Sequence, residues 1–420
     1  MARMAEDMLF AGIDIGSTAV RIAVGQKLPA GDKEQVHIVG AVEVPSEGIN
    51  RGTINSIEDA VSSVSACIEK IERMTGAQLT SAWIAVSGSN IGLLESKGVV
   101  AVSKADGEIR EDDVERAVDA AQTVATPVNV DIIHVIPKSF TVDQQKGVKD
   151  PVGMNGIRLE VDAQIIHGQA SYLKNLQKCV YRTGVNMERL VVGILAAAET
   201  VATSRQKELG VTIVNVGGAT TTVAVFEQGD LVHMASIPVG SEHVTSDLAI
   251  GLRTSIDIAE RAKLQYANGV AKDVPRGDTI NLRELGAEDD ELVSRKYISE
   301  IVQARLEEIL EKVDKELKKI SRSGLLPAGV ILTGGGSKLP GFVDLAKQKL
   351  RLPVSLGYPI GVSSITDRVN DLAFTTAIGL VQWGIDETPD VRKRKGALST
   401  FKSVEKVTAQ LKKWLGGMAP

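Results

Sequence analysis

The sequence FAGIDIGSTAVRIAVG (Phe10–Gly25) is the pattern from which the organisation of this chain can be worked out. An apolar strand runs into the small-residue turn Gly16-Ser17-Thr18, and a second apolar strand leaves it at once. The tip of such a hairpin presents backbone N–H groups and hydroxyls with little side-chain bulk, which suits a phosphate. Asp14 stands just before the turn, where a carboxylate would repel phosphate unless hydrated Mg²⁺ lay between them. Alone, the pattern also fits an ordinary β-turn.

The same pattern returns far along the chain at Val211–Phe226, which reads VTIVNVGGATTTVAVF. Here the turn is Gly217-Gly218-Ala219-Thr220-Thr221, between an apolar strand and a β-branched strand. Two similar hairpins so far apart predict a duplicated domain with a phosphate held between the two tips.

A third glycine-rich turn follows the apolar strand Gly329–Thr333 and precedes an expected helix over Leu339–Leu350. Its residues are Gly334, Gly335, Gly336 and Ser337. Without side chains, this backbone would let a flat ring approach closely. The order of the three turns resembles that of the actin, sugar-kinase and DnaK-chaperone ATPase superfamily, from Phe10 to about Gly384. The resemblance implies an α/β fold of two actin-like domains with duplicated ribonuclease-H-like sheets, which binds ATP with Mg²⁺.

Length and composition describe a globular protein that can form more than one domain. The chain has 420 residues, of which 43% are hydrophobic and 24% charged, and its net charge of −5 suggests no nucleic-acid partner. No signal peptide opens it and no run of about 18 apolar residues occurs, which predicts a protein that stays inside the cell and does not span a membrane. Cys67 and Cys179 lie in helix-like segments and are expected to be buried thiols. The 5 His and 2 Cys lack zinc-ligand spacing.

Three further segments resemble the FtsA family of bacterial cell-division actins. They are Gly48–Asn55 (GINRGTIN), Trp83–Gly88 (WIAVSG) and Val142–Arg158 (VDQQKGVKDPVGMNGIR). Taken alone, Asp150–Gly153 within the last segment predicts only a tight turn. The resemblance implies a small α+β insert that contacts neighbouring subunits and other division proteins. It also implies self-association into filaments and a surface for the C-terminal tail of the tubulin-like protein FtsZ.

Periodicity and the resemblance together divide the chain. The predicted parts are domain I over 9–88, 167–198 and 359–385, the insert over 89–166, the base of domain II over 199–243 and 323–358, its upper lobe over 244–322, a linker over 386–400 and a terminal helix over 401–418. The resemblance places the FtsZ-tail site in the upper lobe. Predicted helices cover Ile57–Thr75, Glu111–Val124, Ala170–Thr183, Val244–Ala262, Lys296–Ser321 and Leu372–Trp383, and a strand over Leu190–Leu195 precedes the crossover between the domains.

In the predicted nucleotide site, the first two turns hold the β- and γ-phosphates and the third borders the adenosine. Glu260 and Lys263 lie one helical turn apart, and in the family this pair meets the ribose and base, although a surface ion pair would give the same spacing. The second turn departs from the superfamily pattern Asp-x-Gly-Gly-Gly-Thr-Thr-Asp, because Asn215 and Ala219 replace its first Asp and third Gly. An amide gives Mg²⁺ no negative charge, and Gly193–Ala198 lacks the superfamily's acid or Gln. We therefore expect ATP binding with slow hydrolysis.

An amphipathic helix is predicted over 401–418, behind a linker that contains the basic cluster Arg392–Lys395. Its apolar face would hold Phe401, Val404, Val407, Leu411, Trp414, Leu415 and Met418. The polar face is rich in lysine, including Lys412 and Lys413. This pattern favours a helix lying in the surface of an anionic membrane, as the family also has at this end. Periodicity alone fits equally a helix docked on protein.

The predicted function is that of an ATP-binding division protein that polymerises and tethers FtsZ filaments to the inner face of the cytoplasmic membrane at the division site. Two other functions use the same fold. A PilM-like adaptor of type IV pilus assembly would lack the terminal helix and the Val142–Arg158 pattern. A small-molecule kinase would need a carboxylate base beside a substrate pocket, and the altered second turn disfavours it.

Overall fold

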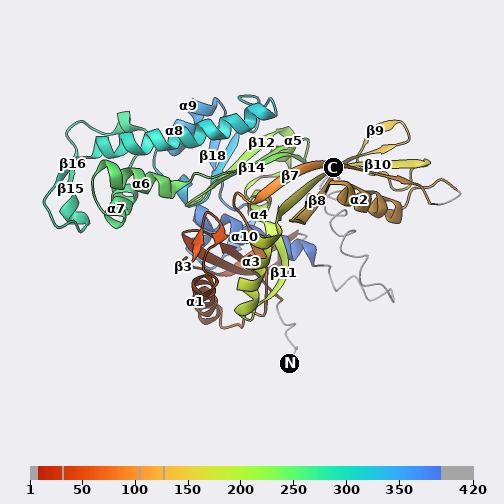
Figure 1. Ribbon diagram of the computed structural model, residues 1–420, viewed down its shortest axis with the longest axis horizontal. Coiled ribbons are helices and arrows are strands. Elements are labelled where there is room, and N and C mark those ends of the chain that lie inside the picture. The colour runs from red at the N-terminus through yellow and green to blue at the C-terminus, as the bar shows by residue number, and fades with distance from the viewer. Residues whose placement is uncertain (1–7, 31–32, 104–105, 126–127, 389–420) are drawn as a thin grey trace. The chain divides into compact units, whose positions relative to one another are not determined.

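The computed structural model describes residues 8–30, 33–103, 106–125 and 128–388. The predicted terminal helix and all but the first residues of the predicted linker lie outside these ranges. The described residues divide into two compact units, one within 8–89 and 178–381 and one within 90–177 and 382–388 (Figure 1). Among the described helices, none combines the length and apolar character needed to cross a bilayer.

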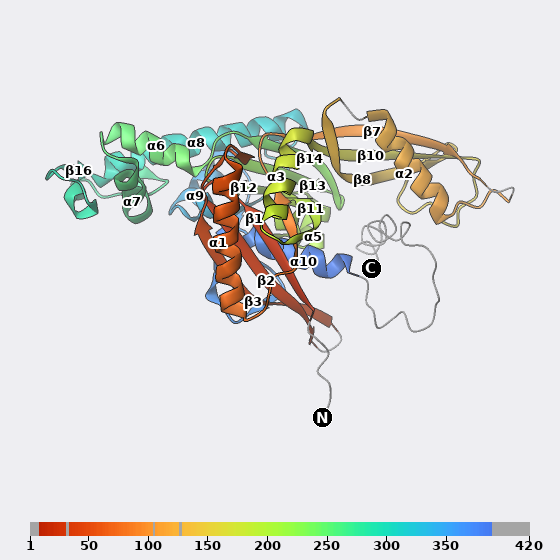
Figure 2. The same cartoon turned by 60° about the horizontal axis from the view of Figure 1, so that its bottom comes forward.

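The larger unit contains two sheets with the same topology (Figure 2). The first has the order β11-β6-β1-β2-β3-β19, with β1 Leu9–Ile15, β2 Ala19–Ala30, β3 Lys33–Pro45, β6 Ser81–Val86, β11 Asn186–Val192 and β19 Val362–Ser364. The second has the order β14-β13-β12-β17-β18, with β12 Val211–Val216, β13 Thr221–Glu227, β14 Asp230–Ile237, β17 Val330–Thr333 and β18 Val354–Leu356.

Five strands of the first sheet correspond one to one to the five strands of the second. In each sheet the first three strands form an antiparallel meander, and two further strands add in parallel beside the first strand. The short strand β19 adds to the first sheet by pairing in parallel with β3. The predicted duplication is therefore confirmed, and it puts the two glycine-rich hairpin tips at equivalent places.

Helices cover the sheets of the larger unit and link them. They are α1 Ile57–Thr75, α4 Gly193–Val201, α5 Ser204–Leu209, α6 Ser241–Gly251, α7 Ile256–Tyr266, α8 Arg295–Lys319, α9 Phe342–Leu350 and α10 Thr375–Glu387, with α3 Ala170–Arg182 at the boundary between the units. Helix α10 packs directly on strand β1 and on α4. A Cβ atom at Gly12 would lie 2.3 Å from the carbonyl oxygen of Ala377, and one at Gly379 would lie 2.0 Å from that of Ala196.

Minor elements complete the unit. They are β4 Ile49–Asn50, β5 Thr53–Ile54, β15 Thr279–Asn281, β16 Leu292–Ser294 and the 3₁₀ turns η1 Ala271–Asp273, η2 Leu282–Leu285, η3 Gly335–Lys338, η4 Asp367–Asn370 and η5 Leu372–Phe374. Helices α6, α7 and α8 form a lobe beside the second sheet (Figures 1 and 2). Its core continues into that of the second sheet.

The smaller unit is an antiparallel sheet with one helix packed on it. The strand order is β7-β10-β8-β9, with β7 Ile91–Ala101, β8 Val130–Val142, β9 Gln145–Val148 and β10 Arg158–Gln169. Helix α2, Glu111–Ala125, covers one face, where the Ser96 hydroxyl donates to the carbonyl of Ala121 at 2.7 Å. The predicted tight turn is present, since the N–H of Val152 donates to Asp150 Oδ1 at 3.0 Å. The α+β insert is confirmed as a part of the fold.

Asp113 ties the start of α2 to the chain before it, and its removal should destabilise the insert. The buried carboxylate accepts hydrogen bonds from the hydroxyl of Ser103 at 2.8 Å, the N–H of Arg110 at 3.0 Å and the guanidinium of Arg116 at 2.5 Å. Burial raises its pKa, but these donors outweigh burial and lower the pKa to about 2. Asp113→Ala should therefore cost about 2–3 kcal/mol of unfolding free energy at pH 7.

The pH dependence of unfolding tests the same contact. Because the folded pKa of Asp113 lies below that of the unfolded chain, its contribution is complete above about pH 4 and disappears as pH falls toward 2. Urea unfolding should then separate wild type from Asp113→Ala at pH 7 and bring them together near pH 2. A difference between the two proteins that does not change over this pH range would contradict the assignment.

Predicted boundaries were wrong in four elements, each for a local reason, and in α10 both ends differ, since it begins at Thr375, after η5, and not at Leu372. The helix predicted over Val244–Ala262 is two helices, because Arg253 has a left-handed φ of 51° and the Ser255 hydroxyl caps α7. The strand predicted over Leu190–Leu195 ends at Val192, because the alanine-rich crossover forms helix α4. The helix predicted from Leu339 begins at Phe342, because η3, a proline and Gly341 at a φ of 77° precede it. Helix α10 runs through Glu387, into the predicted linker.

Candidate functional site

The first hairpin tip is a closed turn braced by the segments that carry the family resemblance. The N–H of Gly16 donates to the carbonyl of Ala19 at 3.1 Å, and the Ser17 hydroxyl accepts the N–H of Gly52 at 3.0 Å. Thr18 is exposed. Gly52 in turn packs on the end of β6, because a Cβ atom there would lie 2.7 Å from the carbonyl oxygen of Ser87.

The second tip meets the first. The N–H of Gly217 donates to the carbonyl of Thr220 at 2.9 Å, and this bond is equivalent to the one from Gly16 to Ala19 in the first tip. A Cβ atom at Gly218 would lie 2.3 Å from Cγ2 of Thr18, so the two tips are in contact. The carbonyls of Gly217 and Gly218 accept the N–H groups of Ser241 and Glu242, at 2.9 and 2.8 Å, which fixes the tip on the start of α6. Ala219 is buried.

Asp14 has the properties expected of a carboxylate that needs a cation. It lies opposite Arg21 in the register of β1 and β2. Burial raises the pKa of Asp14, and the charge of Arg21 opposes this only partly. Within the described chain its carboxylate accepts no hydrogen bond, and Arg21 forms its ion pair with Glu43 at 3.2 Å. A partly buried carboxylate that accepts no hydrogen bond in the described chain and lies beside a phosphate turn fits a hydrated Mg²⁺, which would favour its charged form.

Asn215 links the second tip to the third turn and to α10. Its Nδ2 donates to the Thr376 hydroxyl at 3.2 Å, and its Oδ1 lies 2.2 Å from the position of a Cβ atom at Gly334. Thr376 is one of two adjacent threonines that sequence reasoning missed. The other, Thr375, shares a hydrogen bond of 2.6 Å with Thr333. The available signal was two hydroxyls at the start of a helix whose first half is otherwise apolar.

In the third turn only Gly335 leaves open space above its backbone. Cβ atoms at Gly334 and Gly336 would collide with the second hairpin, the latter 2.6 Å from Val216 Cγ1. A Cβ atom at Gly335 would meet only the Cβ of Ala373, at 3.8 Å. The hydroxyl of Ser337 turns back to the carbonyl of Thr333 at 2.6 Å. The turn therefore offers one bare surface, made of Gly335 and Ala373.

Glu260 and Lys263 border the same region and are not a solvated surface pair. Lys263 is only 5% exposed, and its Nζ lies 2.5 Å from Glu260 Oε2 and 2.8 Å from the Thr245 hydroxyl. It also lies 3.4 Å from the carbonyl oxygen of Ser241, the residue that holds the second tip. Since a Cβ atom at Gly336 would lie 3.1 Å from Ser241 Cβ, the pair, the second tip and the third turn converge at Ser241.

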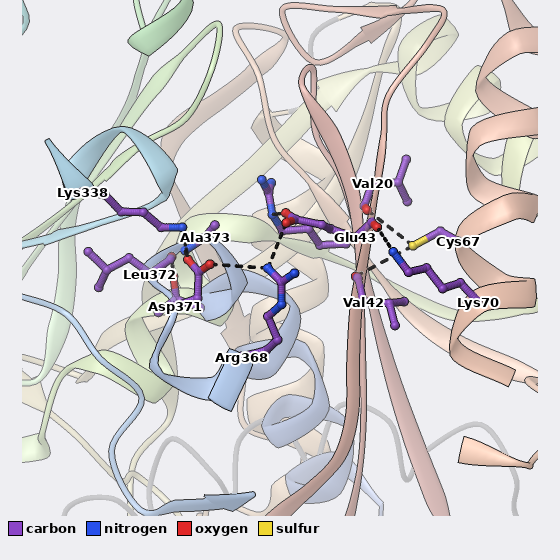
Figure 3. A network of polar contacts seen from close by, with 12 residues as sticks. Val20, Val42, Glu43, Cys67, Lys70, Lys338, Arg368, Asp371, Leu372 and Ala373 are labelled. Carbon is purple, nitrogen blue, oxygen red and sulfur yellow. Dashed lines mark hydrogen bonds and ion pairs between the residues drawn. The ribbon is translucent and has the colours of Figure 1, made fainter. Parts of the chain in front are cut away.

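A cavity of about 560 Å³ adjoins the third turn. It is lined by Lys338, Leu356, Tyr358, Thr366, Asp367, Arg368, Asn370, Asp371 and Leu372, and by none of the residues of the two tips. A polar network crosses its wall, as Figure 3 shows: Lys338 pairs with Asp371, and Arg368 pairs with Glu43 at 2.9 Å. Sequence reasoning missed this network because its members are far apart in the chain.

The remaining predicted features lie elsewhere. The buried crossover helix α4 carries one carboxylate, Glu199, which forms an ion pair with Lys207 at 3.0 Å and so is not free to orient a water molecule. Cys67 and Cys179 are buried free thiols, as predicted. Burial raises the pKa of Cys67 to about 12 and that of Cys179 to about 11. The predicted membrane-binding residues fall outside the described residues.

Comparison with known families identifies two regions of the chain. Residues 212–379 match the family model described as "Cell division protein FtsA", and residues 88–167 match the one described as "SHS2 domain inserted in FTSA". Cell division protein FtsA of Pseudomonas aeruginosa is 35% identical over 420 residues, which cover 99% of this chain and 100% of that protein. The protein of the same name from Escherichia coli K12 is 30% identical over 99% of this chain and 97% of its own length.

Solved structures share the fold at low sequence identity. A chain of the PilM–PilN type IV pilus biogenesis complex has a TM-score of 0.65 at 14% identity, covering 90% of this chain and 99% of its own. MreB5 of Spiroplasma citri, in a crystal structure with bound AMPPNP, has a TM-score of 0.53 at 14% identity, covering 89% of this chain and 95% of its own. Both likenesses concern the fold alone.

Proposed function

Since the chain belongs to the FtsA family of cell-division proteins and has an actin-like fold, we propose that it is an ATP-binding protein that polymerises and tethers FtsZ filaments to the cytoplasmic membrane. One observation carries the proposal of nucleotide binding. The two hairpin tips, the third turn and the pair of Glu260 with the buried Lys263 converge around the start of α6, although they come from four separate parts of the sequence.

Each part of the convergence has a distinct role in the proposed site. The N–H groups of Gly16 and Gly217 close the two turns, and the remaining backbone N–H groups of the tips face the phosphates, where dipoles without side-chain bulk stabilise negative charge. Asp14 holds Mg²⁺ through water, and the metal neutralises the phosphate oxygens. The base lies on the surface of Gly335 and Ala373. Lys263 and Glu260, held by Thr245, meet the ribose and base from the side of domain II.

Binding of ATP is tested directly by calorimetric titration of the purified chain with and without Mg²⁺. We expect saturable binding of one nucleotide per chain that weakens when Mg²⁺ is removed. The variant Asp14→Asn should bind ATP without Mg²⁺ at least as tightly as wild type, because the repelling carboxylate is gone, and its affinity should not increase when Mg²⁺ is added. Absence of binding by wild type at millimolar ATP would overturn the proposed function.

Hydrolysis should be slow, and Asn215 is one reason. An amide in place of a carboxylate gives the metal and its waters no charge, and the one acid of the crossover helix is paired with Lys207. We therefore expect turnover far below the median enzyme's ~10 s⁻¹. Asn215→Asp should raise the turnover rate, because it supplies the negative charge that the amide lacks. The contact with Thr376 can be kept, since its hydroxyl, which now accepts a hydrogen bond from the amide, can donate one to a carboxylate.

Phosphate release in a coupled assay measures this turnover. Asn215→Ala is the matched control, since it removes the contact with Thr376 without adding charge. It should leave turnover at or below the wild-type rate. Steady-state turnover of wild type near ~10 s⁻¹, or an equal increase in the Asp and Ala variants, would contradict the argument.

The proposed protein partners divide between two parts of the fold. The upper lobe over 244–322, with helices α6, α7 and α8, receives the C-terminal tail of FtsZ. The insert over 89–166 contacts neighbouring subunits and other divisome proteins. Support for both comes from family membership, and the region 88–167 matches the family's own insert model. Anionic lipids are the proposed partners of the terminal helix over 401–418, which places the protein on the inner face of the membrane at the division site.

The alternative functions have less support. The PilM chain is 14% identical, whereas FtsA proteins reach 35% across almost the whole chain. A small-molecule kinase would need an unpaired carboxylate facing a substrate. The first candidates, Glu199 and Glu260, are held in ion pairs with Lys207 and Lys263. Transfer of phosphate from ATP to a small hydroxylated substrate would revive the kinase function.

A further inference from the structure

Asp371 holds together the two segments that border the bare surface of the third turn. Its Oδ1 accepts the N–H of Ala373 at 2.9 Å, and Ala373 is the residue that faces Gly335. The same carboxylate forms an ion pair with Lys338, the last residue of η3. One side chain therefore contacts both Ala373 and the end of the glycine-rich turn (Figure 3).

The charge balance around Asp371 keeps this link in its ionised form. Burial would raise the pKa of Asp371, but Lys338 and the N–H of Ala373 outweigh burial and lower it. Arg368 Nη1 lies 3.8 Å from the second carboxylate oxygen and forms a closer ion pair with Glu43, at 2.9 Å. Lys338 forms its ion pair with the carboxylate of Asp371, and the side chain of Lys338 is 46% exposed. The contact with Lys338 can thus be removed without leaving a deeply buried charge.

The segment that contains Asp371 is well anchored, and it also holds the start of the third turn, because the N–H of Gly334 donates to the carbonyl of Leu372 at 3.2 Å. Phe374 is fully buried, with the guanidinium groups of Arg21 and Arg368 over its ring at 5.9 and 5.6 Å. The third turn contains three successive glycines, which have more conformational freedom than any other residue. Ordering such a turn when a ligand binds costs free energy, and a contact that orders it beforehand lowers this cost.

We propose that Asp371 and Lys338 are positioning residues for the base of the bound nucleotide. Their ion pair keeps Gly335 and Ala373 in one small-residue surface on which a flat heterocycle lies. Neither side chain needs to touch the ligand. This inference rests on the proposed nucleotide site and adds that the ion pair between the end of η3 and the segment before α10 helps to set the geometry of its base-binding part, beside the bond from Gly334 to Leu372 at the start of the turn.

Three substitutions separate the ion pair from the fold. Asp371→Asn keeps an acceptor for the N–H of Ala373 and removes the charge. Lys338→Met keeps an unbranched chain without charge, and Lys338→Arg keeps the charge. The dissociation constants of ATP and of inorganic triphosphate, both with Mg²⁺, are measured by displacement of a fluorescent ATP analogue, and the unfolding midpoint of each variant is recorded.

We expect Asp371→Asn and Lys338→Met each to weaken ATP binding about tenfold, which corresponds to one hydrogen-bonded ion pair. The double variant should be no weaker than either single one, because both remove the same contact. Lys338→Arg should bind ATP within about twofold of wild type. Affinity for triphosphate, which has no base, should be unchanged in every variant.

Several results would overturn the inference. One is unchanged ATP affinity in both single variants, and another is additive losses in the double variant. A third is a loss of triphosphate affinity equal to the loss of ATP affinity, because that would mean a general structural role for the ion pair. If wild type binds ATP and the variants bind it equally well, this inference fails and the proposed function stands. If wild type binds neither ligand, the proposed function fails and the inference fails with it.

Discussion

Replacement of Gly335 by leucine should abolish ATP binding while the protein stays folded. The backbone at Gly335 has an ordinary conformation, and a Cβ atom there would meet only Ala373 Cβ, at 3.8 Å, so the folded chain accommodates the new side chain. The rest of that side chain must then occupy the space above Gly335 and Ala373, where the base is proposed to lie. Overpacking of this kind costs typically 1–3 kcal/mol, and the lost contact of the base adds to this cost. We therefore expect the affinity for ATP to fall by about a hundredfold or more.

A graded series provides the control. Gly335→Ala adds only the atom that is in ordinary contact with Ala373 and should weaken binding slightly. Gly336→Ala brings a Cβ atom within 2.6 Å of Val216 Cγ1 and should lower the unfolding midpoint instead. Binding of a fluorescent ATP analogue and thermal unfolding are measured for all three variants. A folded Gly335→Leu protein with wild-type affinity would mean that the base lies elsewhere.

Replacement of Trp414 by glutamate should release the protein from anionic vesicles. Trp414 and Leu415 lie at the centre of the apolar face predicted for the terminal helix. A buried Trp contributes a few kcal/mol at ~25 cal/mol per Å² of apolar area, so its loss weakens binding more than tenfold. Lys413→Ala should weaken binding only modestly, since each lysine near anionic lipid contributes about 1 kcal/mol, and the effect should be larger at low salt.

Sedimentation with liposomes, ATP affinity and the unfolding midpoint are compared for wild type, Trp414→Glu and Lys413→Ala. Both variants should keep wild-type ATP affinity and an unchanged midpoint. A Trp414→Glu protein that still sediments with vesicles but whose globular part unfolds would identify the helix as a part of the protein core.

The parts of the fold that local pattern specifies could be predicted from the sequence. The two hairpins repeat the same alternation around a small-residue turn, so the duplication was visible before the paired sheets were known. Helix α1 was predicted with its true bounds, because Gly76 adopts the left-handed conformation that ends it. The break between α6 and α7 was missed, because a single residue with positive φ, Arg253, interrupts a continuous helical pattern.

Contacts between segments that are distant in the sequence could not be predicted from local sequence patterns. The bond from Asn215 to Thr376 and the pairing of Lys338 with Asp371 depend on how α10 and the segment before it return to the first sheet. The burial of Lys263 was equally invisible, since its spacing from Glu260 fits a surface pair as well. In each case the residue types were unremarkable, and only the tertiary fold brings them to one place.

The tethering of FtsZ to a membrane is the central claim, and one sedimentation experiment tests it most directly. Purified FtsZ is mixed with anionic liposomes and ATP, together with the full-length chain or a chain that ends at residue 388. We predict that FtsZ sediments with the liposomes only when the full-length chain is present, and that removal of the FtsZ C-terminal tail abolishes this. Equal recovery of FtsZ with the shortened chain, or no recovery with the full-length chain, would contradict the claim.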